Sequence, residues 1–146
     1  MRAVLKSRLA RIVVLLLIIL LLALYVGLPL VMAFAAIAPD NSSSGSPPEG
    51  FSELTLTTSD GLSLAAWYAE PTNGAVILVA HGAGAGRSSV IPYASLLHQN
   101  GFGVLALSMR GYDESEGRIN RLGWRGSTDI GAAVSFLQAR DPALKI

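Results

Sequence analysis

The residues best suited to chemistry lie in one short stretch, 75–88, which reads AVILVAHGAGAGRS. Its first half is an apolar run of mostly β-branched residues, typical of a strand buried on both faces. Gly82, Gly84 and Gly86 follow, alternating with alanines. Small residues there let the backbone turn sharply and let a ligand approach main-chain N–H groups. The pattern predicts a strand, a loop rich in backbone donors, and a helix.

Three chemistries use this layout: dinucleotide binding, nucleoside triphosphate binding, and an oxyanion hole, in which N–H groups stabilise a negatively charged oxygen. A dinucleotide fingerprint, G-x-G-x-x-G, fits Gly82 and Gly84 but places Arg87 at the third glycine. A Walker loop, G-x-x-x-x-G-K-[ST], needs a glycine at His81 and a lysine at Arg87. The remaining form, a strand followed by H-G-x-G, suits an oxyanion hole, and a plain glycine-rich turn fits equally well.

The N-terminal part of the chain predicts a membrane helix. Residues 12–38 contain no charged residue and inflate the hydrophobic fraction of 51%. A bilayer-spanning helix needs roughly 20 apolar residues, whereas the core of a cleaved signal peptide has about 7–15. We therefore predict a signal anchor, a transmembrane helix over 12–38, with cleavage after Ala38 as the minority interpretation. Gly27 and Pro29 are tolerated in such a helix and favour a kink.

Charge predicts the orientation of this helix. Four of the 11 Lys and Arg residues lie in a basic tail over 1–11, whereas all ten Asp and Glu residues follow the apolar run. Because the basic end stays in the cytoplasm, we predict a single-pass membrane protein with a cytoplasmic N-terminus and an extracytoplasmic C-terminal domain. The acidic balance of that domain gives no reason to expect nucleic acid as a partner. The chain has no cysteine, which excludes disulfides and thiolate chemistry.

Residues 39–50 are dominated by Ser, Gly and Pro and predict a linker, which leaves a domain over 51–146. Alternation over 51–58 and 62–69 predicts two antiparallel strands joined by a hairpin turn at Asp60-Gly61.

The glycine loop leads into a predicted helix over 90–99, with Ser88 or Ser89 as N-cap and Asn100-Gly101 as its end. The next apolar run, 102–108, predicts a strand parallel to 76–80, because strand, helix and strand with short connections form a βαβ unit.

The rest of the domain begins with a polar, glycine-rich loop over 109–125. A helix capped by Ser127 or Thr128 follows, with Asp129 interpreted as a first-turn acid that complements the helix dipole. Lys145-Ile146 then begins another strand.

This order of elements resembles the N-terminal half of the α/β-hydrolases. The first strand of the βαβ unit ends in His81-Gly82-Ala83-Gly84, and the second leads into residues 108–117, SMRGYDESEG. That loop is similar to the family's D-x-R-G-x-G-x-S-x-G. The matching residues are Arg110, Gly111, Ser115 and Gly117, while Ser108 replaces the aspartate and Asp113 replaces a glycine. The pattern R-G-Y-x-x-S-E-G over 110–117 looks most like the membrane-anchored, serine aminopeptidase-like (BEM46-like) branch of the family.

The resemblance implies a fold class and an activity. The class is α/β: an N-terminal transmembrane helix, then an antiparallel hairpin and a parallel βαβα segment of the α/β-hydrolase sheet, ending before the nucleophile. The implied activity is a serine hydrolase acting on ester, thioester or peptide-like carbonyls, with small-molecule or peptide-like substrates and no cofactor or metal. The backbone N–H groups of the oxyanion hole are then those of Ala83 and Gly84. The residues implied to support the loops are His81, Gly82, Arg110 and Gly111.

The family's nucleophile motif, G-x-S-x-G, does not occur in the sequence. We therefore expect an N-terminal fragment that is inactive alone, whose full-length parent is the enzyme. The alternative is a short membrane-tethered interaction module without catalysis, and a phosphate-binding loop over 82–88 is a weaker third possibility. Asp113, Glu114 and Glu116 admit a cation site, although three solvated acids are the favoured interpretation. Trp67 and Trp124 are expected to cover the edge of the core.

Overall fold

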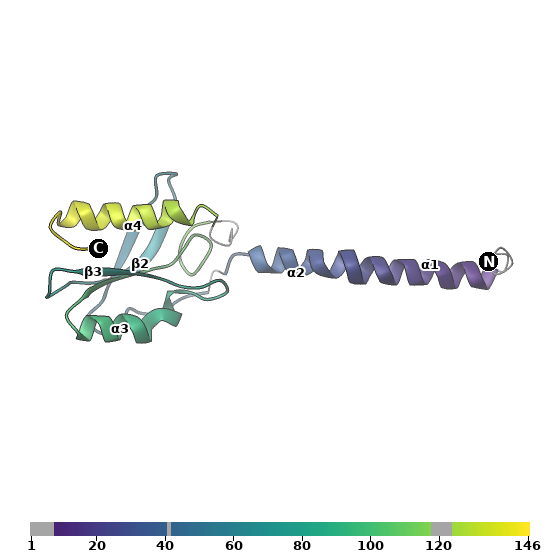
Figure 1. Cartoon of the computed structure of the whole chain (residues 1–146), viewed down its shortest axis with the longest axis horizontal. Coiled ribbons are helices and arrows are strands. Elements are labelled where there is room, and N and C mark those ends of the chain that lie inside the picture. The colour runs from purple at the N-terminus through teal and green to yellow at the C-terminus, as the bar shows by residue number, and fades with distance from the viewer. Residues whose placement is uncertain (1–7, 41, 118–123) are drawn as a thin grey trace. The chain divides into compact units, whose positions relative to one another are not determined.

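The computed structural model describes residues 8–40, 42–117 and 124–146. The chain forms two compact units, Met1–Ala36 and Ile37–Ile146. The first contains a long helix and the second contains a sheet with helices (Figure 1).

The helical unit is one apolar rod in three consecutive segments: α1 (Arg8–Leu22), a π-helical turn (Ala23–Gly27) and α2 (Leu28–Ile37). Over its 30 residues it is long and apolar enough to cross a membrane, by length and composition alone. In the π-helical turn the Leu28 N–H bonds the carbonyl of Ala23, five residues back. The turn lies directly before Pro29, which has no N–H to donate, and such wider turns are typical where the regular ladder is interrupted.

Four strands form a mixed sheet in the order β1-β2-β4-β3. They are β1 (Ser52–Thr57), β2 (Ser63–Ala69), β3 (Val76–Ala80) and β4 (Gly103–Leu107). The antiparallel pairing of β1 with β2 and the parallel pairing of β3 with β4 confirm the sequence predictions. The hairpin turn is also as predicted, with Gly61 at a φ of +83°. Lys145 forms a parallel bridge with Ala75, as expected for the start of a strand beside β3.

Two helices cover opposite faces of the sheet: α3 (Ile91–Gln99), preceded by a 3₁₀ turn (Arg87–Val90), and α4 (Gly126–Arg140) (Figure 1). Gly101 ends α3 at a φ of +85°, as predicted. The predicted N-caps are wrong for both helices.

The cap position of α3 is Val90, and the hydroxyl of Ser89 instead donates to the Gly86 carbonyl. The cap position of α4 is Arg125, at a φ of +69° and without a side-chain cap. Helix α4 therefore begins earlier than Ser127 or Thr128.

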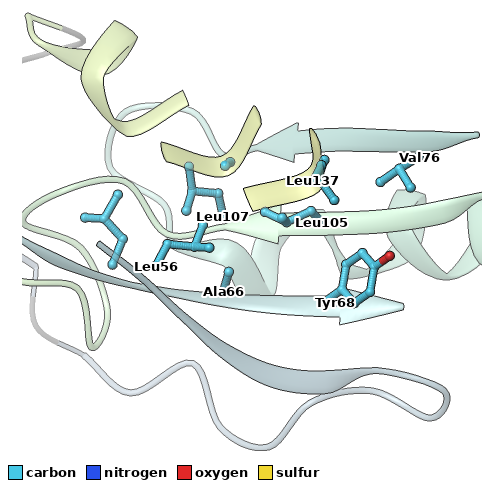
Figure 2. Packing of buried hydrophobic residues seen from close by; sticks show 9 residues of the cluster. Leu56, Ala66, Tyr68, Val76, Leu105, Leu107 and Leu137 are labelled. Carbon is cyan, nitrogen blue, oxygen red and sulfur yellow. The ribbon is translucent and has the colours of Figure 1, made fainter. Parts of the chain in front are cut away.

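The core has one apolar cluster on each face of the sheet. Figure 2 shows the cluster under α4, where Leu137 packs over Leu105 and Leu107 of β4. On the α3 face Trp67, Val90 and Ala106 pack together. Every residue of β4 is buried because this strand has a neighbour on each side and a helix over each face.

The two tryptophans differ from each other. Trp67 is 1% exposed, whereas Trp124 is 74% exposed, so the expectation that both cover the core edge is wrong for Trp124.

Candidate active site

The glycine loop begins where β3 ends, at the carboxyl end of the parallel strands. Ala83 and Gly84 form an exposed turn, and Gly84 has a φ of +74°, a conformation that favours glycine. The N–H of Gly84 donates to the hydroxyl of Tyr112 at 3.0 Å. Within the described part of the chain, no group accepts a hydrogen bond from the Ala83 N–H. Of the two predicted donors, Ala83 is therefore available to a ligand and Gly84 is occupied.

His81 connects the glycine loop to the loop after β4. The residue is 9% exposed, and Nε2 accepts the Met109 N–H at 3.1 Å. Nδ1 lies 2.9 Å from the carbonyl oxygen of Gly82, so the tautomer protonated at Nδ1 satisfies both contacts. The ring also meets Tyr112 edge-on, with centroids 4.5 Å apart. Both nitrogens are therefore engaged with main-chain groups, and neither is placed as a free base.

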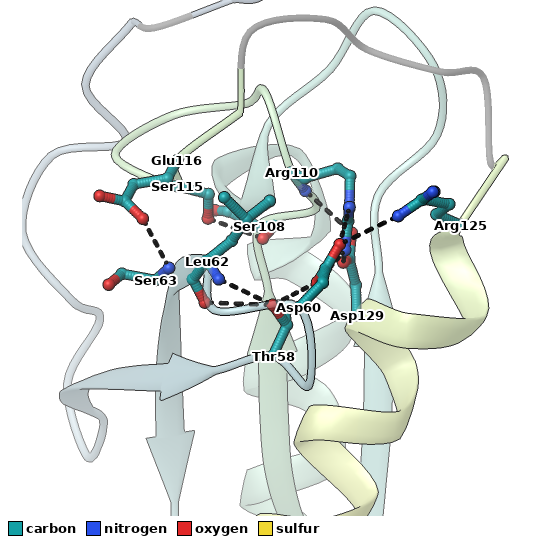
Figure 3. A network of polar contacts seen from close by, with 10 residues as sticks. All are labelled: Thr58, Asp60, Leu62, Ser63, Ser108, Arg110, Ser115, Glu116, Arg125 and Asp129. Carbon is teal, nitrogen blue, oxygen red and sulfur yellow. Dashed lines mark hydrogen bonds and ion pairs between the residues drawn. The ribbon is translucent and has the colours of Figure 1, made fainter.

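Arg110 lies in a buried ionic network (Figure 3). Its guanidinium bonds Asp129 through Nε at 2.8 Å and through one terminal nitrogen at 2.6 Å, and its backbone N–H reaches the same carboxylate at 3.1 Å. The two terminal nitrogens bond Asp60 at 2.9 and 3.1 Å. Arg110 therefore joins the β1–β2 turn, the loop after β4 and helix α4.

The network changes the interpretation of Asp129. The sequence predicts a first-turn acid that serves the helix dipole, but its side chain is 0% exposed and paired with Arg110. A buried carboxylate of this kind needs a cation and hydrogen bonds to offset its desolvation. Hydrogen bonds to Asp60 and Asp129 raise the pKa of the Arg110 guanidinium. Hydrogen bonds from Arg110 and Thr58 hold the pKa of the Asp60 carboxyl well below its usual range.

Hydrogen bonds hold the loop 108–117 against β2. The hydroxyl of Ser115 donates to the Ser108 carbonyl at 2.8 Å and accepts the Ala65 N–H at 2.8 Å. Glu116 accepts the Ser63 N–H at 2.8 Å (Figure 3).

Two glycines of this loop meet closely. Gly111 has a φ of +78° and its N–H bonds the Glu116 carbonyl at 3.1 Å. A Cβ on Gly117 would lie 2.7 Å from the Gly111 nitrogen, so this close approach requires glycine at 117.

The acids of this loop are bonded, so the expectation that they are simply solvated is wrong. Asp113 is 4% exposed and accepts the Arg87 N–H at 2.9 Å. Glu114 pairs with the Arg87 guanidinium at 2.8 Å. Among the described residues no group of three or more His, Asp or Glu side chains gathers to hold a metal ion.

Sequence reasoning missed Arg87 and Asp113 as partners because they lie far apart in the chain. The available signal is that Asp113 stands where the resembling motif has a glycine. Arg87 is 2% exposed and directed into the protein, which leaves its guanidinium turned away from any phosphate on the glycine loop.

Part of the segment predicted as a linker lies along the same loop. The Asp40 N–H donates to the Gly111 carbonyl at 2.9 Å, and the Asp113 N–H donates to the Asp40 carbonyl at 2.7 Å. The Ser43 hydroxyl and the Ser44 N–H both bond Glu114, at 2.9 and 3.0 Å. Burial raises the pKa of the Glu114 carboxyl, but the hydrogen bonds from Ser43 and the backbone, with the charge of Arg87, outweigh burial and leave that pKa lowered.

Relatives of the chain are found among proteins about twice its length or more. It is 33% identical over 116 residues to the uncharacterized protein Rv2307c of Mycobacterium tuberculosis, covering 75% of this chain and 40% of that protein. It is 42% identical over 69 residues to the thiohydrolase aneE of Aspergillus aculeatus, covering 46% of this chain and 22% of that protein. No family model matches the sequence. The chain thus spans about two fifths or less of the curated relatives it matches.

Solved structures share the arrangement of strands and helices. The esterase PF2001 of Pyrococcus furiosus superposes with a TM-score of 0.65 at 21% identity, covering 75% of this chain and 45% of the esterase. The α/β-hydrolase GrgF of a Penicillium species superposes with a TM-score of 0.52 at 22% identity, over 60% of this chain and 32% of GrgF. The unit Ile37–Ile146 has the fold of the N-terminal half of an α/β-hydrolase.

The α/β-hydrolase fold gives the glycine loop a defined position. In this chain that loop joins β3 to α3 and contains Ala83 and Gly84. The bridge from Lys145 to Ala75 places the segment after α4 beside β3.

Proposed function

We propose that the chain is the N-terminal part of a membrane-anchored serine hydrolase that acts on ester, thioester or peptide-like carbonyls. The observation that carries this proposal is that Ala83, an exposed residue in the loop after β3, has an N–H with no acceptor among the described residues. The names of two similar proteins, a thiohydrolase and an esterase, support carbonyl hydrolysis.

The chemistry follows from the availability of that N–H. When a nucleophile attacks a carbonyl, negative charge develops on the carbonyl oxygen, and a preorganised donor stabilises it. Ala83 supplies such a donor. Gly84, the other predicted donor, gives its N–H to Tyr112 and so fixes the turn that presents Ala83. In the α/β-hydrolase fold, one donor comes from the loop after the third strand and the other from the residue after the nucleophile. We therefore expect the second donor on the turn after the strand that Lys145 begins.

Anchoring is part of the same proposal. The helix Arg8–Ile37 has a mean hydropathy of 3.1 in its most apolar window and no buried side chain. We place its basic end in the cytoplasm and the hydrolase domain outside, by the positive-inside rule. Alkaline carbonate extraction tests insertion, and protease access to the domain in intact cells tests its side. Release of the protein by carbonate, or protection of the domain from protease, would contradict the respective part.

The first experiment reads the gene past codon 146. An open frame that continues into a strand and G-x-S-x-G supports the proposal, and a fluorophosphonate probe should then label the encoded protein at that serine. A stop codon directly after Ile146 rules out catalysis by the family's triad and leaves the interaction module as the hypothesis.

Removal of the Ala83 N–H tests its role directly. Gly84 has the positive φ required at the third position of a type II turn, and proline is favoured at the second position, which Ala83 occupies. We therefore expect Ala83→Pro in the encoded hydrolase to preserve folding but lower kcat/KM for an acyl ester about 10²–10³-fold. The matched control Ala83→Ser keeps the N–H and should change kcat/KM only a few-fold. Equal activity of the two variants would exclude Ala83 as the donor.

A further inference from the structure

The far end of the glycine loop is held by a second buried arginine. The Arg87 guanidinium donates to the Ser108 hydroxyl at 2.8 Å and pairs with Glu114 at 2.8 Å. Its central carbon lies 4.5 Å from the centre of the Trp67 ring, a favourable cation–π distance. These contacts fix Arg87 between the glycine loop, the loop after β4 and the α3 face of the core.

Asp113 completes this arrangement from an unusual backbone conformation. Its φ is +51°, in the left-handed region that non-glycine residues seldom adopt. Its carboxylate nevertheless accepts two hydrogen bonds, one from the Arg87 N–H at 2.9 Å and one from the Ser108 hydroxyl. The chain therefore keeps this uncommon conformation at a position where one carboxylate oxygen, Oδ2, accepts both hydrogen bonds.

The same carboxylate lies directly against the glycine loop. A Cβ built on Gly86 would lie 1.9 Å from Oδ1 of Asp113, so the loop can approach this closely only with glycine at 86. Asp113 thus contacts two consecutive residues, Gly86 and Arg87. At the near end of the loop, Tyr112 holds Gly84. Neighbouring residues of one loop therefore fix both ends of the other.

The contact between Ser108 and Asp113 joins the two positions at which this chain departs from the resembling motif. The resembling motif has an acid at 108 and a glycine at 113, and this chain has Ser108 and Asp113. The two departures lie in contact, since the Ser108 hydroxyl bonds the Asp113 carboxylate. We propose that they compensate each other: the carboxylate comes from 113 instead of 108, and Asp113 with Ser108 forms the positioning pair that fixes the glycine loop through Arg87. This role holds whatever ligand the loop binds.

The test is a rescue experiment on the intact chain in lipid nanodiscs, with amide hydrogen exchange followed by mass spectrometry. Asp113→Gly removes the carboxylate and restores the glycine of the motif, and the double variant Ser108→Asp/Asp113→Gly returns the acid to 108. We expect Asp113→Gly to speed exchange of the Arg87 amide, which donates to the Asp113 carboxylate, about tenfold, as loss of a buried hydrogen-bond acceptor implies. The double variant should return exchange to within about threefold of the wild type.

The controls separate positioning from general loss of structure. Glu116→Gln alters an acid of the same loop that bonds Ser63 and not the glycine loop, so it should leave exchange of the Arg87 amide unchanged. The amides of β4 report the core in every variant. If Asp113→Gly unfolds the domain, refolding by Ser108→Asp still supports the proposal.

Unchanged exchange in Asp113→Gly, or a double variant no better than the single one, overturns the proposal. The readout needs no catalysis, so a failure of the proposed hydrolase activity remains distinguishable.

Discussion

Two buried arginines follow neighbouring parallel strands, and they are neutralised in different ways. Arg110, after β4, meets two carboxylates, Asp60 and Asp129, the second of which is fully buried. Arg87, after the β3 loop, meets one carboxylate whose side chain is 42% exposed, together with a hydroxyl and an aromatic ring. The guanidinium of Arg110 therefore has a mainly ionic environment, and that of Arg87 has a mainly neutral one.

The difference separates stability from positioning. Arg110 ties the β1–β2 turn to α4, so its network holds together elements that define the domain. Arg87 and its partners tie one loop to another. Breaking a buried ion pair leaves an uncompensated charge inside the protein and is strongly destabilising. Loosening a hydrogen bond between two loops changes mainly the population of loop conformations.

The largest effect should come from Asp129→Ala. This substitution leaves Arg110 without the partner that its Nε, one terminal nitrogen and backbone N–H all contact. We expect the free energy of unfolding to fall by about 3–5 kcal/mol, measured by denaturant unfolding followed by tryptophan fluorescence. Asp141→Ala, an exposed acid just after the same helix, is the control and should cost less than about 1 kcal/mol. Similar losses of unfolding free energy in the two variants would refute the stabilising role assigned to the Arg110–Asp129 ion pair.

A smaller, pH-dependent effect should come from Asp60→Asn. Arg110 holds the pKa of the Asp60 carboxyl below its value in the unfolded chain, which is about 3.9. A depressed pKa stabilises the fold above the unfolded value, and this stabilisation is lost as the pH falls through the folded value. The wild type should therefore be the more stable protein at pH 7, and its advantage over the variant should narrow below about pH 4. A constant difference in the unfolding free energy from pH 7 to pH 3 would contradict this expectation.

The strands and two of the three strand pairings follow from local patterns in the sequence, whereas the pairing of β2 with β4 was not predicted. Alternation over 51–58 and 62–69, the Asp60-Gly61 turn and the two apolar runs are properties of a few adjacent residues, and the structure confirms the pairings they predict. Parallel neighbours then follow from the short helical connection.

The helix caps, the buried acids and the ionic network of Arg110 could not be predicted from such local patterns. Asp129 reads as an ordinary first-turn acid until Arg110 is brought beside it, and Asp113 reads as solvated until Arg87 lies against it. These roles depend on partners from other elements, which single-sequence periodicity does not encode. The predicted oxyanion donors lie on one exposed turn, but the engagement of Gly84 by Tyr112 is a tertiary contact of the same kind.

The smallest effect should come from a third arginine, which is on the surface. Arg140 pairs with Glu70, with side chains 46% and 60% exposed, and its guanidinium lies 5.1 Å from the centre of the Tyr68 ring. Water screens such pairs, so Glu70→Gln should change the free energy of unfolding by less than about 1 kcal/mol. A double-mutant cycle with Arg140→Gln isolates the pair itself. A coupling energy as large as the loss in Asp129→Ala would mean that burial does not set the strength of these pairs. A coupling well below that loss is the expected result, because both pairs join an arginine to a carboxylate but only Arg110–Asp129 is buried and joined by three hydrogen bonds.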